Sequence, residues 1–401
     1  MTGIRIDESF AAGLRRELAE RLVASGDIRT PVWRRAVEAV PREVFLGGCV
    51  FLRRDEGPFT RWEAVTPEDA GVEGWLRLAY SDETLVTQIR QVGQADRDGR
   101  IGGEPTSSST LPGLVVSMLE DLRVEDGQRV LEIGTGTGYS TALLCHRLGH
   151  DDLVTSIEVD SGIAAKTAAA LHEAGYRPRL VVGDGLAGHP DGAPYDRLIA
   201  TCSVRHIPWA WIEQVRPGGI ILATLSGWLY GSGLARVTVT GEGTASGVFL
   251  PDPVSFMTAR AHHAPDLPAP PRDGDRRQAA LGADILNEWV SRWIAQLAVP
   301  DACSFTVFDG FDPVTCVFDG ESYAWLSASA SDGWIVTQGG PRRLWDRVEA
   351  SVRAWRDAGA PGQERFVLTI ADGRQVVSCP GHPALAWNLP ISDPQASSAA
   401  C

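Results

Sequence analysis

The chain has 401 residues, which is long enough for two domains with full hydrophobic cores. Its formal net charge of −14 at pH 7 argues against a nucleic-acid backbone or an anionic membrane as the main partner. No run of 18 apolar residues occurs, and the seven cysteines are scattered without a C-x-x-C pair, which disfavours a disulfide scaffold or a zinc ribbon. We therefore expect a cytoplasmic protein with neither a nucleic-acid nor a membrane partner.

The first hundred residues predict helices followed by less regular segments. Residues 7–41 carry apolar side chains at helical spacing and predict two helices that separate near residues 25–31. Residues 51–75 show no clear periodicity, and the polar, glycine-rich residues 93–103 predict a surface loop. We group residues 1–104 as an N-terminal helical region with insertions.

A row of hydroxyl residues follows, in the sequence PTSSSTLPGL at 105–114. One interpretation is a helix cap, in which Thr110 caps a helix that has Pro112 in its first turn. The other is that one or two of these hydroxyls point into an active site. The two interpretations are compatible, because capping needs only part of the row.

The most informative stretch is RVLEIGTGTGY at 129–139, an apolar run that breaks into a turn with three glycines. It predicts a buried strand, a turn that a ligand can approach closely, and a helix over residues 140–148. The stretch fits G-x-G-x-x-G poorly, because Tyr139 stands where the third glycine belongs, and no phosphate-binding G-x-x-x-x-G-K-[ST] occurs.

Two acids accompany this turn. Glu132 directly precedes it and suits a cationic ligand. Glu158 ends a second apolar strand about twenty residues on, where an acid hydrogen-bonds ribose hydroxyls. The combination suits S-adenosyl-L-methionine. The plainer alternative is a strand–helix turn without a ligand in an α/β protein.

Strands and helices continue to alternate beyond this point. Residues 180–185 and 193–202 predict further strands, the first ending in Asp184, and residues 220–227 return to the sheet. This rhythm predicts a doubly wound, largely parallel Rossmann-like sheet with its ligand at the carboxyl ends of the strands. Residues 235–250 predict a β-hairpin.

The proline-rich, polar residues 262–275 predict a linker. The region before it, 105–261, is then the α/β domain that would bind S-adenosyl-L-methionine, and residues 276–390 form a C-terminal α+β accessory domain, with a helix expected over 277–297. The last residues, 391–401, are expected to be a disordered tail.

With these pieces in place, residues 35–260 resemble the protein-L-isoaspartate O-methyltransferase family. The matching fragments occur in the family's order: PREVF, AYSDE, the hydroxyl row, VLEIGTGTGYSTALL, SIEVD, GDGLAG, APYDRLIAT and RPGGIIL. The resemblance implies a class I methyltransferase that uses S-adenosyl-L-methionine and releases S-adenosyl-L-homocysteine. The predicted cofactor-binding residues are Glu132, Gly134, Thr135, Gly136, Thr137, Gly138, Tyr139, Glu158, Val159, Gly183, Asp184, Gly185, Leu186 and Thr201.

On the substrate side, anchoring the family's motif on Pro112 assigns the catalytic positions to Ser108 and Thr110, with threonine where the family has serine. The added C-terminal domain and the long N-terminal insertions resemble the branch that acts on ribosomally made, modified peptides. The implied partner is a macrocyclised precursor peptide whose aspartate is methylated and then closes to an aspartimide. Repair of isoaspartate is the alternative in the same chemistry, and an inactive binding scaffold is the alternative of another class.

No metal is predicted. His146 and His150 stand at metal-ligand spacing, but Gly149 between them marks the end of a helix, where histidine is favoured anyway. The sequence leaves the oligomeric state open.

Overall fold

The structure is a computed structural model that describes residues 8–56, 59–329 and 333–391, so most of the predicted tail lies outside the described residues. Contacts divide the chain into two compact units. The first comprises residues up to 201 together with 214–222, and the second comprises 202–213 and the residues from 223 onward.

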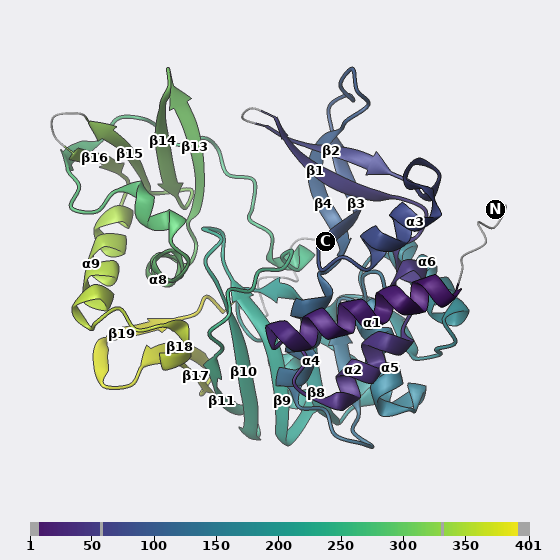
Figure 1. Cartoon of the computed structure of the whole chain (residues 1–401). Coiled ribbons are helices and arrows are strands. Elements are labelled where there is room, and N and C mark those ends of the chain that lie inside the picture. The colour runs from purple at the N-terminus through teal and green to yellow at the C-terminus, as the bar shows by residue number, and fades with distance from the viewer. Residues whose placement is uncertain (1–7, 57–58, 330–332, 392–401) are drawn as a thin grey trace. The chain divides into compact units, whose positions relative to one another are not determined.

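Two helices begin the first unit, α1 (Glu8–Ser25) and α2 (Pro31–Ala39), as the sequence predicts. Leu14, Leu18 and Leu22 of α1 are buried. Helix α1 packs on α2, and α2 packs on α5 (Tyr139–Leu148), which follows the glycine turn (Figure 1). The N-terminal helices therefore cover the element on which the candidate site is built.

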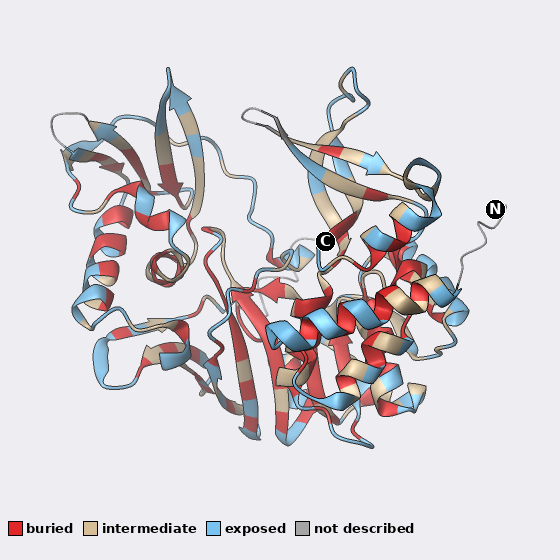
Figure 2. Ribbon diagram, viewed as in Figure 1, coloured by how far each residue is buried: buried red, intermediate tan, exposed pale blue. Residues whose placement is uncertain are grey.

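The centre of the first unit is a doubly wound parallel sheet, which confirms the predicted fold class. Strand β5 pairs in parallel with β6 on one side and with β8 on the other, and β7 continues the sheet beyond β6. All residues of β5 and β6 are buried, as Figure 2 shows for much of this sheet. The parallel strands are β5 (Val130–Ile133), β6 (Val154–Glu158), β7 (Arg179–Val182) and β8 (Tyr195–Val204); β9 (Val215–Ser226) lies next to β8, and helix α6 (Ser161–Glu173) follows β6.

The sequence did not predict a four-stranded antiparallel sheet in the first unit, with the order β2-β1-β3-β4. Its elements are β1 (Val50–Glu56), β2 (Phe59–Val65), β3 (Leu85–Val92) and β4 (Gly102–Ser109), with the short helix η1 (Arg42–Leu46) before them and α3 (Pro67–Ala79) between β2 and β3. Strand β4 reads GGEPTSSS, which has few residues that favour strands, so its pairing with β3 sets its conformation. The sheet ends at the hydroxyl row, just before α4 (Pro112–Leu122).

Among the described residues, the second unit contains two antiparallel arrangements and three α-helices, of which α7 (Trp209–Gln214) is the first. The predicted hairpin is present as β10 (Ser232–Gly241) and β11 (Thr244–Phe249). Strand β11 pairs with β17 (Val367–Ala371), which continues to β18 (Arg374–Cys379) and β19 (His382–Asn388). The other sheet has the order β12-β16-β15-β14-β13, formed by β12 (Asp275–Gln278), β13 (Cys303–Asp309), β14 (Asp312–Phe318), β15 (Tyr323–Ser329) and β16 (Gly333–Gly339).

Helix α8 (Trp289–Ala298) is shorter than the helix predicted over 277–297, because residues 275–278 pair with β16 instead. Helix α9 (Leu344–Asp357) agrees with the sequence pattern. The contacts also group residues 223–261 with the C-terminal part of the chain. The linker at 262–275 therefore remains a prediction about domain division.

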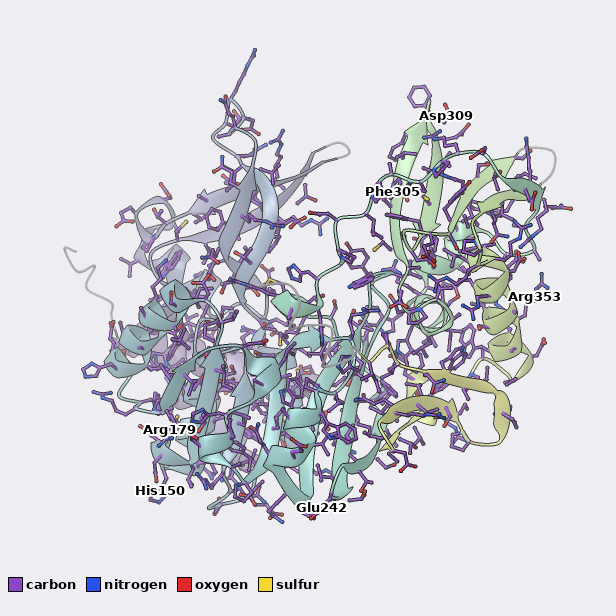
Figure 3. All side chains as sticks on the ribbon, turned by 180° about the vertical axis from the view of Figure 1, so that it is seen from behind. His150, Arg179, Glu242, Phe305, Asp309 and Arg353 are labelled. Carbon is purple, nitrogen blue, oxygen red and sulfur yellow. The ribbon has the colours of Figure 1, made fainter. Side chains whose placement is uncertain are left out.

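The second unit has aromatic cores. Trp293 of α8 is 2% exposed and meets Phe249 and Phe366 edge-on, with ring centroids 4.9 and 5.0 Å apart. Phe305 of β13, labelled in Figure 3, packs against Phe318 and Trp325 in a second cluster. These contacts account for several of the tryptophans as structural residues.

Within the described residues, no helix is long and apolar enough to cross a membrane. No group of three or more His, Cys, Asp or Glu side chains in that part of the chain could hold a metal ion. His150, the second of the two spaced histidines, lies exposed in the loop after α5 (Figure 3).

Candidate active site

The turn between β5 and α5 has a backbone that requires glycine. Gly134, Gly136 and Gly138 have φ angles of 93°, 54° and 94°, in the left-handed region that side chains disfavour. A Cβ at Gly138 would lie 2.6 Å from a methyl group of Thr167. The backbone N–H groups of Gly134 and Thr135 donate to the Ile157 carbonyl at 2.9 and 3.1 Å, which fixes the turn against the end of β6.

Glu158, the last residue of β6, lies directly beside this turn. One of its carboxylate oxygens accepts from the Gly136 N–H at 3.0 Å, and the other accepts from the Asp160 N–H at 3.0 Å. A carboxylate can accept about four hydrogen bonds, so Glu158 keeps capacity for further donors such as ligand hydroxyls.

Glu132 has a structural part that the sequence did not suggest. Its side chain is fully buried and accepts hydrogen bonds from the hydroxyls of Ser140 and Thr141, both at 2.5 Å, and of Ser156 at 2.7 Å. Burial raises the pKa of this carboxyl group above its ordinary value, against the opposing effect of the three hydroxyls. These contacts brace the strand and helix behind the turn, so direct contact between Glu132 and a ligand remains a prediction.

The other predicted cofactor residues fall into two groups. Thr135, Gly138 and Tyr139 are buried, and Thr135 forms a 2.7 Å hydrogen bond with Ser156. The second group is exposed or partly exposed at the carboxyl ends of the parallel strands or in the turn itself: Gly134, Gly136, Thr137, Val159, Gly183, Asp184, Gly185, Leu186 and Thr201.

Hydrogen bonds hold the ends of the neighbouring strands together. The Gly183 N–H donates to the Glu158 carbonyl at 3.0 Å, and the Thr201 hydroxyl donates to the Ile133 carbonyl at 3.2 Å and to that of Gly134. Asp184 is exposed and accepts from the Leu186 N–H at 3.0 Å. The structure thus brings the ends of β5, β6, β7 and β8 to one edge, as the parallel sheet predicts.

Along the hydroxyl row, side chains whose hydroxyl is hydrogen-bonded within the fold alternate with side chains whose hydroxyl is not. We call the hydroxyls of the second kind uncommitted. Ser107 and Ser109 are buried and hydrogen-bonded, to Thr87 and Arg42 respectively, each at 3.3 Å. Ser108 and Thr110 are partly exposed, and neither hydroxyl bonds to any residue that the structure describes. Residues two apart in an extended segment share a face, so these two hydroxyls are presented together.

The helix-cap interpretation of Thr110 is wrong. Helix α4 begins at Pro112 with Leu111 at its N-cap and without a capping side chain at that position. Asp82 accepts from the Gly113 N–H at 2.7 Å, and the Thr84 hydroxyl accepts from the Leu111 N–H at 3.1 Å. Side chains from the segment before β3 therefore satisfy the start of α4, and Thr110 is left for another role.

Arg42, which the sequence did not single out, supports the row from behind. Its side chain is fully buried, and its guanidinium donates to the carbonyls of Ala79, Ser81 and Glu83 at 2.9 Å each. It also donates to the carbonyls of Ser109 and Thr110 at 3.2 and 3.1 Å. Burial lowers the pKa of Arg42 to about 10, so the group stays charged at neutral pH.

The hydroxyl row lies against the glycine turn. A Cβ built on Gly136 would lie 3.8 Å from the carbonyl oxygen of Ser108. At Gly183 a Cβ would meet nothing within 4 Å, so the backbone at the end of β7 is open. A ligand on the turn would therefore sit next to the uncommitted hydroxyls.

Comparison with known proteins identifies the family. The family model described as protein-L-isoaspartate(D-aspartate) O-methyltransferase matches residues 80–232. A protein-L-isoaspartate O-methyltransferase from Hyperthermus butylicus is 32% identical over 222 residues, which cover 53% of this chain and 75% of that protein. This chain belongs to the protein-L-isoaspartate O-methyltransferase family.

Two further members are similar to this chain. Protein-L-isoaspartate O-methyltransferase 1 from Rhodopseudomonas palustris is 32% identical over 233 residues, covering 58% of this chain and 77% of that protein. A solved structure named protein-L-isoaspartate O-methyltransferase, 19% identical, aligns over 91% of this chain and 99% of its own with a TM-score of 0.52. That likeness shows the fold, and its extent shows that most of this architecture also occurs in a protein of that name.

The family is one of S-adenosyl-L-methionine-dependent methyltransferases, so this chain is a member of an enzyme family with that cofactor. The open backbone at Gly136 and Gly183 and the spare acceptor capacity of Glu158 fit such a ligand. Arg42 and Asp82, which the sequence reading overlooked, lie in PREVF and AYSDE, two fragments on which the resemblance rests.

Proposed function

We propose that this chain transfers a methyl group from S-adenosyl-L-methionine to the side-chain carboxylate of an aspartyl or isoaspartyl residue in a peptide. The observation that carries the proposal is the proximity of the hydroxyl row to the glycine turn, 3.8 Å between the Ser108 carbonyl and a Cβ position at Gly136. Uncommitted hydroxyls next to a cofactor turn are suited to holding an acceptor carboxylate.

On the cofactor side, we assign Gly134, Gly136 and Thr137 to close backbone approach and Glu158 to the ribose hydroxyls. Asp184, with its neighbours in the loop after β7, would line the adenine, and Thr201 would close the opposite side. Glu132, Thr135 and Tyr139 would support this surface from inside the fold, in keeping with their burial.

Methyl transfer to a carboxylate requires few chemical groups from the protein. When bound, the cofactor supplies an electrophilic methyl group, and a carboxylate is already a nucleophile at neutral pH. Ser108 and Thr110 would donate hydrogen bonds that align the acceptor oxygen, while Arg42 keeps their backbone in place. No general base is needed, because no proton has to leave the acceptor.

Two substrates fit this chemistry. Isoaspartate in damaged proteins is supported by the names of relatives at 32% identity. Aspartate in a macrocyclised, ribosomally made peptide is supported by threonine at position 110, where the family's motif has serine. The C-terminal extension supports this macrocyclic substrate less than the sequence suggested, since a structure named protein-L-isoaspartate O-methyltransferase aligns over 91% of this chain.

If the substrate is an aspartate in a macrocyclised peptide, a further step would follow methylation without the enzyme. The backbone nitrogen of the next residue bonds to the ester carbonyl carbon, the bond to the methoxy oxygen breaks, and methanol leaves with the amide proton. The product is a succinimide ring, the aspartimide. A macrocycle that holds the two groups together would raise the rate of this ring closure.

Intact-mass spectrometry tests the proposal. The full chain is incubated with S-adenosyl-L-methionine and three peptides of one sequence, containing aspartate, isoaspartate, or aspartate within a side-chain macrocycle. Methylation of the isoaspartyl peptide alone assigns repair, and methylation of the macrocycle followed by loss of methanol assigns aspartimide formation. Methylation of none of them, by protein that binds S-adenosyl-L-homocysteine, would overturn the proposed acceptor.

A further inference from the structure

A polar hollow of about 720 Å³, counting the open solvent at its mouth, is lined entirely by residues of the second unit. Its walls come from residues 297–302 at the end of α8 and just beyond it, from Leu344 and Arg347 of α9, and from residues 386–388 of β19. Figure 1 shows these three elements in the same part of the second unit, and α8 and α9 both contact β19. The hollow shares no residue with the candidate active site.

The charges around the hollow leave one cation without a partner. Asp319 pairs with Arg342 at 2.9 Å, and Asp301 pairs with Arg205 at 2.6 Å. Arg347 is exposed and forms no ion pair or side-chain hydrogen bond with any residue in the described ranges. The ionisable residues that line the hollow are Asp301, Asp319, Arg342 and Arg347; with Arg205, which pairs with Asp301, this group carries one net positive charge, although the whole chain carries −14.

The backbone of β19 adds a second kind of recognition group. Among the strands that the structure describes, β19 is the edge strand of its sheet and pairs only with β18. Asn388 lies opposite Val376, and the Leu389 N–H donates to Gln375 at 2.9 Å. Because bonding directions alternate along an antiparallel strand, the N–H and C=O of Ala386 and Asn388 point away from β18. These groups bond to no residue that the structure describes.

Trp387 completes the wall between these two positions. Its indole N–H donates to the Ser351 hydroxyl of α9 at 3.3 Å, which fixes the ring at the edge of the hollow. A free strand edge, an aromatic wall and an uncompensated arginine are the groups that recognise an extended peptide with an acidic side chain.

We propose that this hollow is a docking site for an extended acidic peptide segment. The peptide adds as a strand to β19 through Ala386 and Asn388, and one of its carboxylates pairs with Arg347. The identity of that peptide as part of the substrate rests on the proposed function, whereas the binding itself does not.

Fluorescence anisotropy tests the binding with the full chain and no cofactor. The probe is a fluorescein-labelled octapeptide that alternates valine and glutamate, so it contains no aspartate to methylate, and the matched peptide carries lysine instead. We expect saturable binding of the glutamate peptide only. Arg347→Glu should weaken it about tenfold or more, because attraction becomes repulsion. Equal binding of the lysine peptide, or no loss in Arg347→Glu, would overturn the proposal.

Two matched controls refine the assignment. Arg356→Glu makes the same charge change nine residues along α9, on the opposite face of the helix, and should leave affinity within about twofold. Asn388→Ala keeps the backbone N–H and should bind normally, whereas Asn388→Pro removes it and should bind weakly. Equal losses in Arg347→Glu and Arg356→Glu would show a general charge effect and would reject the site.

A kinetic experiment separates this inference from the proposed function. Joining the glutamate segment to a methylated peptide should lower KM in the unaltered protein, with kcat unchanged, and should have no such effect in Arg347→Glu. If no peptide is methylated but the glutamate peptide still binds through Arg347, the proposed function fails and the docking site stands. If a peptide is methylated, but the acidic segment does not lower its KM and the glutamate probe does not bind, the docking site fails and the proposed function stands.

Discussion

At the level of single residues, the candidate active site contains two kinds of hydroxyl group: those that form hydrogen bonds within the fold and those that do not. The hydroxyls of Ser107 and Ser109 are buried and hydrogen-bonded, while the hydroxyls of Ser108 and Thr110 make no hydrogen bond to the described residues. Arg42 holds the backbone of this row, since it donates to the carbonyls of Ser109 and Thr110, which lie on either side of the Thr110 Cα. Its effect on catalysis would act through the positions of other groups.

Thr110→Ala should lower kcat/KM about 10- to 100-fold, since a hydrogen bond to a charged group contributes about 1.5–3 kcal/mol. The affinity for S-adenosyl-L-homocysteine, measured by calorimetry, should not change, and Thr110→Ser should retain most of the activity. Ser107→Ala is the matched control, because its hydroxyl is committed to Thr87. Normal turnover in Thr110→Ala would remove this residue from the substrate side.

Arg42→Lys should destabilise the protein by about 3 kcal/mol, because one ammonium group cannot satisfy the carbonyls that the guanidinium reaches. At a temperature where the variant remains folded, kcat/KM should still fall about tenfold through displacement of Thr110. Calorimetry should show unchanged affinity for S-adenosyl-L-homocysteine. If affinity and kcat/KM fall together, Arg42 supports the whole unit and does not specifically position the hydroxyl row.

At the level of elements, the site depends on a turn whose conformation only glycine adopts without strain. Gly136 has a φ of 54°, its N–H donates to Glu158, and its carbonyl accepts from the Thr167 hydroxyl at 2.5 Å. The turn is thus held on both sides by neighbouring elements, and a ligand would meet a preformed backbone.

Gly136→Val should abolish measurable binding of S-adenosyl-L-homocysteine, because a branched side chain would fill the space between the turn and Ser108. Gly127→Val is a useful control, since Gly127 also has a left-handed φ of 77° but no atom lies within 4 Å of its Cβ position. It should share the backbone strain and keep the ligand. Retained affinity in a folded Gly136→Val protein would place the cofactor elsewhere.

The sequence predicted the parallel sheet well and the antiparallel sheet before it poorly. β5 (VLEI) and β6 (VTSIE) are fully buried, and β5 breaks into a glycine turn while β6 ends in Glu158, so the turn and the acid mark both strands in the sequence. β4 contains two glycines, a proline and three serines, so only its partner strand makes it a strand. Arg42 could not be assigned a role either, because its carbonyl partners leave no pattern of side chains in the sequence.

For the molecule as a whole, buried histidines in the second unit affect acid stability. The rings of His206 and His262 lie 4.9 Å apart, and both are over nine-tenths buried. Nδ1 of His262 accepts from the Arg205 N–H at 3.1 Å, so this nitrogen carries no proton in the folded protein. Burial, with the neighbouring His206 and Arg205, lowers the pKa of His262 to about 4, and burial also lowers that of His206.

Stability should therefore fall as the pH is lowered from 7 to 5. In this range the unfolded chain, with a histidine pKa near 6.5, binds a proton that the folded His262 does not bind. The loss from His262 alone should be about 2 kcal/mol. Thermal unfolding at both pH values should show that His262→Asn, which keeps an acceptor for Arg205, loses less stability between pH 7 and pH 5 than the unaltered protein. The exposed control His263→Asn should lose as much stability as the unaltered protein. Identical pH profiles in all three proteins would contradict this account.

A second prediction at this scale concerns truncation. A chain that ends after Pro268 loses β17, which pairs with residues 245–248 of β11, so an unpaired strand edge remains. We expect an insoluble product, whereas a chain that ends after Ile391 should remain folded. The soluble fraction and the circular dichroism spectrum of each truncated chain test these two expectations. A soluble truncated protein that binds S-adenosyl-L-homocysteine would show that β11 needs no pairing with β17.

The pairing of β11 with β17 also has a consequence for how the protein is made. The two strands are separated by more than a hundred residues, so β11 leaves the ribosome long before its partner exists. At roughly 5–20 residues per second, the edge of this nascent strand stays open for about 6–25 seconds. Slower translation through the segment before β17 should therefore lower the yield of folded protein in the cell, while the refolding of purified, complete chains would not share this sensitivity.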